Sequence, residues 1–320
     1  MRNPLRFTLC AAALAAAAIA PAAGATEVNL KAAAFLPVKS VYVVQFMRWV
    51  GEVNKQCAGK VNISVVGPEA IKSLEQWNAL KNGVVDMHYG PPNYYVGAVP
   101  EGDVISVARN ESAAQRKNGA WALINEVHNQ KLNAWYLTHL MNGVRFHIYT
   151  LKPGKDGKFE GFRLRSTPIY DAFFKSLGGL PVRMAPPEVH TALERGAVDG
   201  YGWPLWGIAD FGWHKYTKYR YGPGFISAAV AILVNLDKWK SLDNDQRQCL
   251  TRTAEWVEGE WPKWRAAESG KQQAVQDQAG IKYVDLGPRF ANQAEELYWE
   301  TLAKGNPAFV NRVRPLLSGK

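Results

Sequence analysis

The sequence predicts an α/β protein built of two lobes, and two observations support that fold class. Strand-like and helix-like segments alternate along the chain, which is typical of sheets flanked by helices. One element also occurs twice, at 79–86 and again at 192–199, each time as a helix end, a glycine stop and a short strand. The copies are too far apart for a solenoid repeat. A corresponding element in each of two lobes therefore explains them better than the alternative, which is chance.

In the first half of the chain, alternating apolar residues predict strands and apolar residues at helical spacing predict helices. The expected strands are 28–31, 61–65 and 84–87. The expected helices are one capped by Ser40, one that carries Leu74, Trp77 and Leu80 and stops at a left-handed Gly83, and one over 121–132.

The second half continues the alternation and ends in helices. The segment 134–149 is rich in strand formers and predicts a strand that crosses between the lobes. A long helix is expected from Asp243 to about Gly280, with a kink at Pro262. The other expected elements are strands at 162–165, 180–184, 226–236 and 282–286, and a helix from Pro168 to Gly178-Gly179.

The first 25 residues are typical of a secretory signal peptide. Arg2 and Arg6 form a basic region, residues 7–20 are uncharged and apolar, and Ala23-Gly24-Ala25 resembles a cleavage site. A membrane anchor is the alternative, but the apolar stretch is shorter than the roughly 20 residues of a spanning helix. Lipidation at Cys10 is disfavoured because 7–9 lacks the small residues of a lipoprotein signal. We expect cleavage after Ala25 and a periplasmic protein.

The composition indicates a folded protein with no nucleic-acid partner. Hydrophobic residues make up 47% of the chain. Without Arg2 and Arg6 the chain has 36 basic and 28 acidic residues, a net charge of +8, and the basic residues are not clustered. Such a field favours anionic solutes. Cys57 and Cys249 remain after processing, and the sequence leaves open whether they form a disulfide or two buried thiols.

Binding chemistry is expected rather than catalysis. The common protease, hydrolase, dinucleotide and phosphate-loop motifs are absent, and His88, His147 and His190 are interpreted as surface or core residues. We therefore expect no enzyme, no metal and no cofactor. The strongest candidate is Arg165, which alternates with Leu164 on an expected strand and whose planar guanidinium suits a carboxylate. A solvated surface arginine is the alternative.

Three ordered segments resemble one known signature. They are 160–165 (EGFRLR), 177–184 (LGGLPVRM) and 188–200 (EVHTALERGAVDG). Together they are similar to the signature of the TRAP-transporter solute-binding proteins, the DctP family. The likeness extends back through 80–86 and covers most of the mature chain.

The resemblance implies which residues contact a ligand. The family arginine that pairs with the substrate carboxylate falls on Arg165, and a second arginine falls on Arg145 within Asn142-Gly143-Val144-Arg145. The ligand-contacting position four residues after the signature aspartate falls on Trp203. Trp206 and Tyr201 are nearby candidates, with a tryptophan-rich core as the alternative.

On the opposite lobe, Phe35, Tyr89 and Tyr95 follow expected strand ends, where clefts form in open α/β sheets, and each could form a lid or pack internally. The chain also departs from the family pattern. Ser166-Thr167-Pro168 replaces a proline after the binding arginine, Pro186-Pro187 replaces a more usual pair, and Trp203 replaces a polar amide. These changes favour an apolar, flat or 2-oxo acid over a sugar acid.

The resemblance implies a two-lobed periplasmic-binding-protein fold with crossing strands, a hinge and a long C-terminal helix that spans both lobes. We expect a first lobe of 26–142 plus 229–268 and a second lobe of 143–228 plus 269–320. The expected function is capture of a small organic acid, with 2-oxo or aromatic monocarboxylates favoured, by a monomer that delivers it to TRAP-type permease subunits. The alternatives are a solute sensor for a membrane receptor and, less favoured, a periplasmic hydrolase or lyase.

Overall fold

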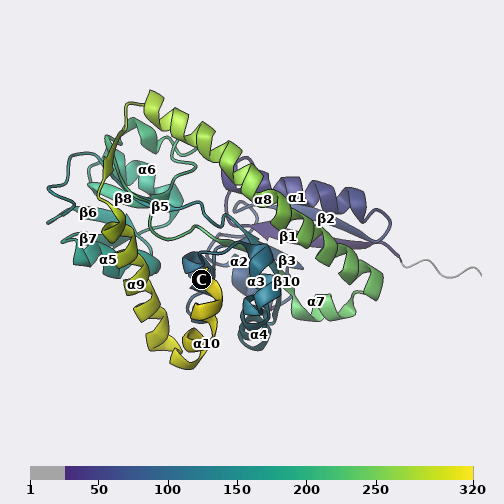
Figure 1. Ribbon diagram of the computed structural model, residues 1–320. Helices are drawn as coiled ribbons and strands as arrows, with labels where there is room; N and C mark the ends of the chain where they lie inside the picture. Colours follow the sequence, from purple (N-terminus) through teal and green to yellow (C-terminus); the bar gives the residue numbers. More distant parts are fainter. Residues whose placement is uncertain (1–25, 320) are drawn as a thin grey trace, which may run out of the picture.

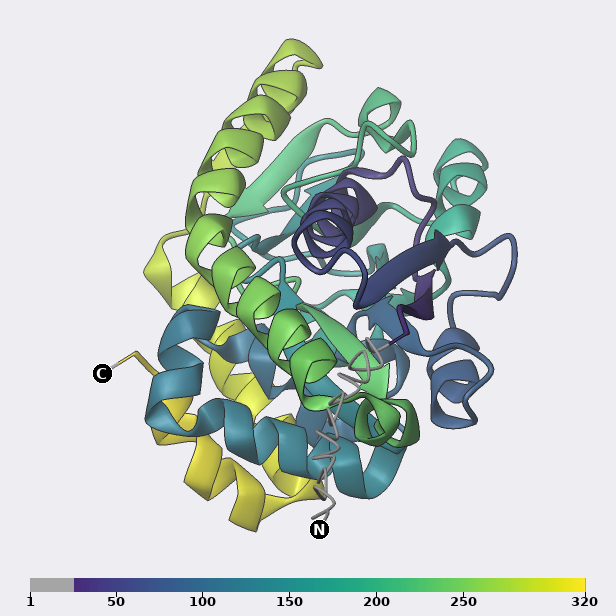
Figure 2. The same cartoon turned by 90° about the vertical axis from the view of Figure 1, so that its right-hand side faces the viewer.

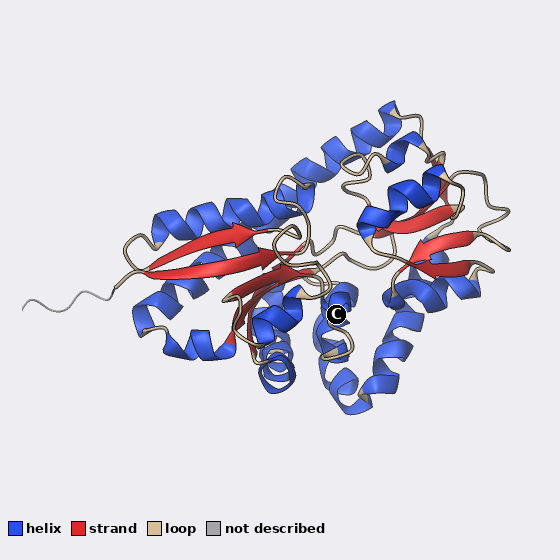
Figure 3. Cartoon of the chain, turned by 180° about the vertical axis from the view of Figure 1, so that it is seen from behind, coloured by secondary structure: helices blue, strands red, loops and turns tan. Residues whose placement is uncertain are grey.

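The computed structural model describes residues 26–319 and has the predicted two-lobed α/β fold (Figure 1). The chain builds two separate sheets, which lie toward opposite ends of the molecule in Figure 3. The predicted signal peptide, its cleavage site and Cys10 lie outside the described residues. None of the described helices has both the length and the apolar character that crossing a membrane requires.

The first sheet has the strand order β2-β1-β3-β10-β4. β1 is parallel to β2 and β3, whereas β10 is antiparallel to β3 and β4. This sheet and the helices α1, α2, α4 and α7 packed on it form the first lobe. Its strands are β1 Val28–Ala34, β2 Val61–Val66, β3 Met87–Gly90, β4 Ala134–Leu140 and β10 Val230–Asn235.

The second sheet has the strand order β11-β9-β5-β8-β6-β7 and, with α5 and α6, forms the second lobe. β6 is parallel to β7 and β8, and β5 is antiparallel to β8 and β9. Every residue of β5 and β8 is buried, so these two strands carry the core. The strands are β5 Phe146–Thr150, β6 Arg163–Ser166, β7 Leu180–Arg183, β8 Gly200–Pro204, β9 Tyr219–Gly222 and β11 Lys282–Asp285.

The helices begin and end close to the predicted positions. Ser40 caps α1, as expected, and α8 runs through Pro262 without interruption. The α-helices are α1 Val41–Gln56, α2 Gln76–Lys81, α3 Ser112–Asn118, α4 Ala120–Leu132, α5 Asp171–Ser176, α6 Pro186–Glu194, α7 Leu236–Ser241, α8 Asn244–Gln278, α9 Pro288–Gly305 and α10 Pro307–Leu317. Short 3-10 helices are η1 Pro92–Tyr94, η2 Pro100–Val107, η3 Pro168–Tyr170 and η4 Trp213–Lys215.

The repeated sequence element forms the same helix stop in each lobe. Gly83 and Gly196 have φ of 71° and 64°, and the next residue in each copy donates its backbone N–H to a carbonyl in the preceding helix, at 2.9 Å and 2.8 Å. Asp86 and Asp199 then accept the backbone N–H of Lys31 and Arg163, each at 2.9 Å. The strand predicted at 84–87 is therefore wrong in its bounds. Residues 83–86 complete the helix stop, and β3 begins at Met87.

Two crossing segments and the helices α8 and α9 connect the lobes. The predicted crossing strand is found as β4 followed by β5, joined through 141–145, and the chain returns through 223–229 between β9 and β10. The two segments run side by side, because Arg145 and Ser227 form an antiparallel bridge. Helix α8 spans both lobes along one side of the molecule (Figure 2). The residue boundaries of the lobes stay a prediction.

The two C-terminal helices pack against both lobes. Helix α10 packs on α3, α4 and η2, and α9 contacts both η2 and α5.

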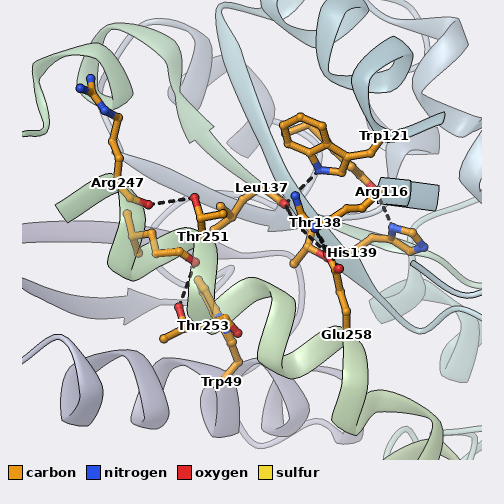
Figure 4. Close-up of polar contacts among 12 residues, drawn as sticks. Trp49, Arg116, Trp121, Leu137, Thr138, His139, Arg247, Thr251, Thr253 and Glu258 are labelled. Atoms are coloured by element: carbon orange, nitrogen blue, oxygen red, sulfur yellow. Dashed lines mark hydrogen bonds and ion pairs between the residues drawn. The ribbon is translucent and has the colours of Figure 1, made fainter. Parts of the chain in front are cut away.

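Polar contacts and one disulfide bond hold helix α8 against the first lobe. Glu258 accepts a hydrogen bond from Thr138 of β4 at 2.6 Å and pairs with Arg116 at 2.7 Å (Figure 4). Because Glu258 is buried, these partners offset the cost of removing its charge from water. The structure also joins Cys57 and Cys249 in a disulfide, which settles the alternative that the sequence leaves open and links the end of α1 to α8.

Candidate functional site

Arg165 lies in β6 with a side chain that is only 1% exposed. Its guanidinium donates to neutral groups alone: the hydroxyl of Tyr170 at 3.0 Å, the carbonyl of Gly202 at 3.3 Å, and the carbonyl of Met184 from Nε at 3.2 Å and from Nη2 at 3.1 Å. An arginine has five N–H donors, so these four bonds leave one N–H, on Nη2, for another acceptor.

No protein carboxylate neutralises this charge. In the chain from 26 to 319, no Asp or Glu oxygen lies within 4.0 Å of the Arg165 nitrogens. The ring of Trp203 lies 5.2 Å from the Arg165 Cζ, and its π-face compensates part of the charge. A buried guanidinium without an anionic partner is costly, and an anion that reaches it gains a strong, water-poor contact.

Arg165 lines a cavity of about 40 Å³ between the lobes. By this measure one water needs roughly 10–15 Å³, so the cavity has room for about three water-sized groups. Arg165 is the only charged residue in its lining, and most of the other side chains are apolar. The lining residues are Phe35, Tyr42, Pro91, Asn93, Tyr94 and Ser106 from the first lobe, Phe146, Arg165, Thr167, Ile169, Tyr170, Trp203 and Pro204 from the second, and Ser227–Val230 from the returning crossing segment and the start of β10.

A second, larger cavity of about 320 Å³ also has Arg165 in its lining, and we call the smaller cavity the inner one and the larger cavity the outer one. It has both lobes in its lining, with Leu74 on one side and Met184 on the other. The two cavities share four lining residues, which we call the neck: Asn93, Tyr94, Arg165 and Thr167. The guanidinium therefore borders both cavities.

Two of the predicted lid and pocket aromatics line the inner cavity. Phe35 extends from the end of β1 and packs edge-on against Tyr94, with ring centroids 5.9 Å apart. Trp203 is 6% exposed and donates its indole N–H to the carbonyl of Trp206 at 2.9 Å, which fixes its ring. These two side chains bring an aromatic surface from each lobe to Arg165.

Four other predicted aromatics lie in the core and do not line either cavity. Tyr89 stacks on Phe46 with centroids 4.4 Å apart, and Tyr201 stacks on Tyr149 at 5.1 Å. The Tyr95 hydroxyl is hydrogen-bonded to His128 at 3.0 Å, and the Trp206 indole donates to Ser269 at 3.0 Å. Their polar atoms meet protein partners, so they act as packing residues.

Arg145 is not brought to the cavity either. Its guanidinium donates to the carbonyls of Gly224 and Phe225, and burial lowers its pKa. Those carbonyls belong to the crossing segment that precedes Ser227–Val230. In this structure the side chain therefore supports the wall of the cavity, where the two crossing segments run antiparallel, and the direct ligand contact expected for Arg145 stays a prediction.

Sequence reasoning missed three tyrosines of the cavity: Tyr42, Tyr94 and Tyr170. Burial raises the pKa of Tyr94 to about 12, and the nearby Arg165 opposes that rise. Burial also raises the pKa of Tyr170, so both phenols stay neutral and cannot supply the missing negative charge. For Tyr94 a signal existed, since it adjoins the predicted Tyr95. The turn of η1 decides which of the two faces the cleft.

The lobes touch directly across the cleft. The Tyr42 hydroxyl of α1 donates to the carbonyl of Trp206 at 2.8 Å, and the rings of Tyr42 and Trp203 meet edge to face with centroids 6.1 Å apart. At the start of α1, the backbone N–H of Val41 donates to the Asp210 carboxylate at 2.9 Å. These contacts join α1 of the first lobe to the loop after β8 of the second, so they favour a closed arrangement.

The site offers neither a metal centre nor an acid and base in contact. Within the described residues, no three His, Cys, Asp or Glu side chains gather as metal ligands would. The cavity lining contains one cation and neutral groups. This arrangement is suited to an anion whose remainder contacts aromatic rings.

Comparison with known proteins supports the same architecture. A family model described as DctP, bacterial extracellular solute-binding protein, family 7, matches residues 33–304. A solute-binding protein of Roseobacter denitrificans is 21% identical over 305 residues, which cover 91% of each chain.

Two solved structures share the fold at low identity. One is a TRAP periplasmic solute-binding protein from Desulfovibrio desulfuricans with bound sn-glycerol-3-phosphate, with a TM-score of 0.80, 20% identity, and coverage of 92% of this chain and 98% of that one. The other is DctP7 of Bordetella pertussis, an extracytoplasmic solute receptor that binds pyroglutamic acid, with a TM-score of 0.76, 18% identity, and coverage of 91% and 99%.

Proposed function

This chain belongs to family 7 of the bacterial extracellular solute-binding proteins, the DctP family, and from that premise we propose that it captures a small organic carboxylate between its lobes. We further propose that it works in the periplasm and delivers its solute to a TRAP-type membrane permease. The family consists of binding proteins, which accords with a cavity that holds one cation and no acid or base pair.

A single observation carries the carboxylate assignment: the guanidinium of Arg165 is buried, faces the interlobe cavity and has only neutral protein partners. A ligand carboxylate accepts the remaining N–H of Nη2 and competes with the Tyr170 hydroxyl for a second donor. That contact becomes stronger as the lobes close, because closure excludes water from the charged pair.

The lining supports a monocarboxylate with an apolar or flat remainder. With Arg165 as the one charged lining residue, a second carboxylate on the ligand would enter the cavity without a cation. Phe35 from the first lobe and Trp203 from the second offer aromatic surfaces in the same cavity as the guanidinium. Small 2-oxo acids and aromatic monocarboxylates fit this description, and of the two the smaller acids suit the 40 Å³ of the inner cavity better.

The test is a calorimetric titration of the mature protein with a panel of organic acids, repeated with Arg165→Ala. Removing the guanidinium leaves the ligand carboxylate buried without its partner, which costs about 2 to 5 kcal/mol, or roughly 30- to 4,000-fold in affinity. The matched control is Arg163→Ala. Arg163 lies on the same strand, exposed, and pairs with Asp199, so its removal should change affinity less than about threefold.

Two results would contradict the proposal. One is binding of neutral sugars with no response to any carboxylate. The other is an equal loss of affinity in the Arg165 and Arg163 variants, which would show that the buried position has no special part in binding.

A further inference from the structure

Two polar atoms at the neck have no partner within the protein. The side-chain oxygens Asn93 Oδ1 and Thr167 Oγ1 are both buried, and neither has a partner with good hydrogen-bond geometry among the described residues, although Thr167 is close enough to the Tyr170 hydroxyl to oppose the rise in its pKa. Both residues line the inner and the outer cavity together with Arg165. Buried polar atoms are nearly always hydrogen-bonded, so two orphaned oxygens beside one guanidinium need an explanation.

Four other hydroxyl groups that line the cavity each have a hydrogen-bond partner within the protein. Ser106 donates to Asp103 at 2.8 Å, Tyr42 to the carbonyl of Trp206 at 2.8 Å and Tyr170 to the carbonyl of Gly202 at 3.1 Å. Ser227 accepts the backbone N–H of Gly143 at 3.2 Å. Among the side chains that line the inner cavity, Asn93 Oδ1 and Thr167 Oγ1 are therefore the fully buried polar atoms without a partner, one from each lobe.

The hydrogen-bonding chemistry of the two oxygens limits which functional group of a ligand can pair with both. An amide oxygen only accepts a hydrogen bond, whereas a threonine hydroxyl both donates and accepts. A ligand hydroxyl donates to Asn93 and accepts from Thr167, so one group satisfies both atoms. A ketone accepts from Thr167 but leaves Asn93 unpaired, and a methylene satisfies neither.

We propose that the neck selects carboxylates that carry a hydroxyl group, with Arg165 holding the carboxylate and Asn93 and Thr167 holding the hydroxyl from opposite lobes. This inference rests on the proposed function and refines it, because it ranks hydroxy acids above the 2-oxo acids of the same skeleton. It also gives the hydroxyl a part in closure, since the two oxygens that it joins belong to different lobes.

The test compares acids that differ at one position. Lactate, pyruvate and propionate form a small series, and mandelate, benzoylformate and phenylacetate form an aromatic one. Within each series the dissociation constants are measured by calorimetry. A site that pairs a ligand hydroxyl discriminates against analogues that leave its own groups unpaired. We expect the hydroxy acid of the preferred series to bind about 5- to 100-fold more tightly than the matched acid with a methylene.

Variants at the neck give the second readout. Thr167→Val keeps the shape of the side chain and removes the hydroxyl, and Asn93→Leu removes the amide. Each should reduce the ratio between the affinities of the hydroxy acid and its methylene analogue to within about threefold of unity. Thr167→Ser, which restores a hydroxyl, should recover most of the ratio. Because the readout is a ratio within one variant, a general loss of folding or affinity does not imitate it.

The outcomes separate this inference from the function beneath it. If the 2-oxo or methylene acid binds as tightly as its hydroxy analogue in the parent, the hydroxyl assignment is wrong while carboxylate capture stands. An unchanged ratio in both neck variants overturns the assignment in the same way. If no acid of either series or of the wider panel binds, the proposed function itself fails.

Discussion

Removing the disulfide between Cys57 and Cys249 tests how the first lobe is held together. The bond closes a loop with a sequence separation of 192 residues. The loop-closure relation converts that length to about 18 cal/mol/K, or about 5 kcal/mol at 25 °C, by which the bond destabilises the unfolded chain. A folded chain of roughly 290 residues gains about 0.6 kcal/mol/K of entropy on unfolding, so loss of the bond should lower the Tm by about 8 °C.

The assay is thermal unfolding of the parent protein with and without reductant, beside the double variant Cys57→Ala, Cys249→Ala. The reduced parent keeps both sulfur atoms and isolates the cross-link, whereas the double variant also removes buried volume. Both should still fold, because α1 and α8 are also joined by the hydrogen bond from the Trp49 indole to the Thr253 carbonyl at 3.1 Å. A fall in Tm of less than about 2 °C on full reduction would refute the loop-closure reasoning.

Two further predictions concern closure and acid. Asp210→Ala removes the carboxylate that accepts the Val41 N–H across the cleft. Because this contact is exposed, the ligand affinity should fall only about 2- to 5-fold, mainly through a faster dissociation rate measured by stopped-flow. An unchanged dissociation rate would show that this contact does not hold the lobes closed. Burial lowers the pKa of His88 to about 3, so the folded state binds fewer protons than the unfolded state, whose histidines titrate near 6.5, and stability is lost as pH falls below that value. His88→Leu should therefore flatten the fall in unfolding free energy between pH 6.5 and 4.5 by about 2 kcal/mol, as measured by urea titration, and an unchanged pH profile would contradict this.

The sequence predicts most of the fold and the central residue of the site, because both depend on local patterns. Alternation places Arg165 only on the face opposite to Leu164, which leaves a solvated arginine open, and the resemblance selects it from 38 basic residues. The helix stops at Gly83 and Gly196 follow from the same kind of local rule. Cys57 and Cys249 could not be paired from the sequence, since their approach depends on how α1 packs on α8.

Some residues of the cavity could not be predicted from local sequence patterns alone. Phe35 lies four residues beyond Lys31 and Thr167 lies four beyond Arg163, and both line the cavity. Lys31 and Arg163 are equivalent, since each receives the aspartate of its own repeat. Comparing the two copies of the repeat would therefore have predicted Thr167, which was not predicted to contact the ligand.

The same comparison explains why Tyr89 is a core residue. It lies three residues beyond Asp86, and the position three beyond Asp199 is Gly202, inside β8. The cavity lining begins two residues later in the first lobe, at Pro91, and one residue later in the second, at Trp203. A prediction that a strand end lines a cleft is accurate only when the register of that end is known to within one residue.

Ligand charge and lobe closure are linked through Arg165. Closure removes the guanidinium from water, and its neutral protein partners do not compensate a full charge. An anion that binds at the neck supplies the counter-charge, so the closed form gains more from an anion than the open form does, and this difference is what shifts the equilibrium toward closure. A neutral solute of the same shape would fill the same space but leave the guanidinium uncompensated. Selectivity for anions is therefore a consequence of closing over a buried cation.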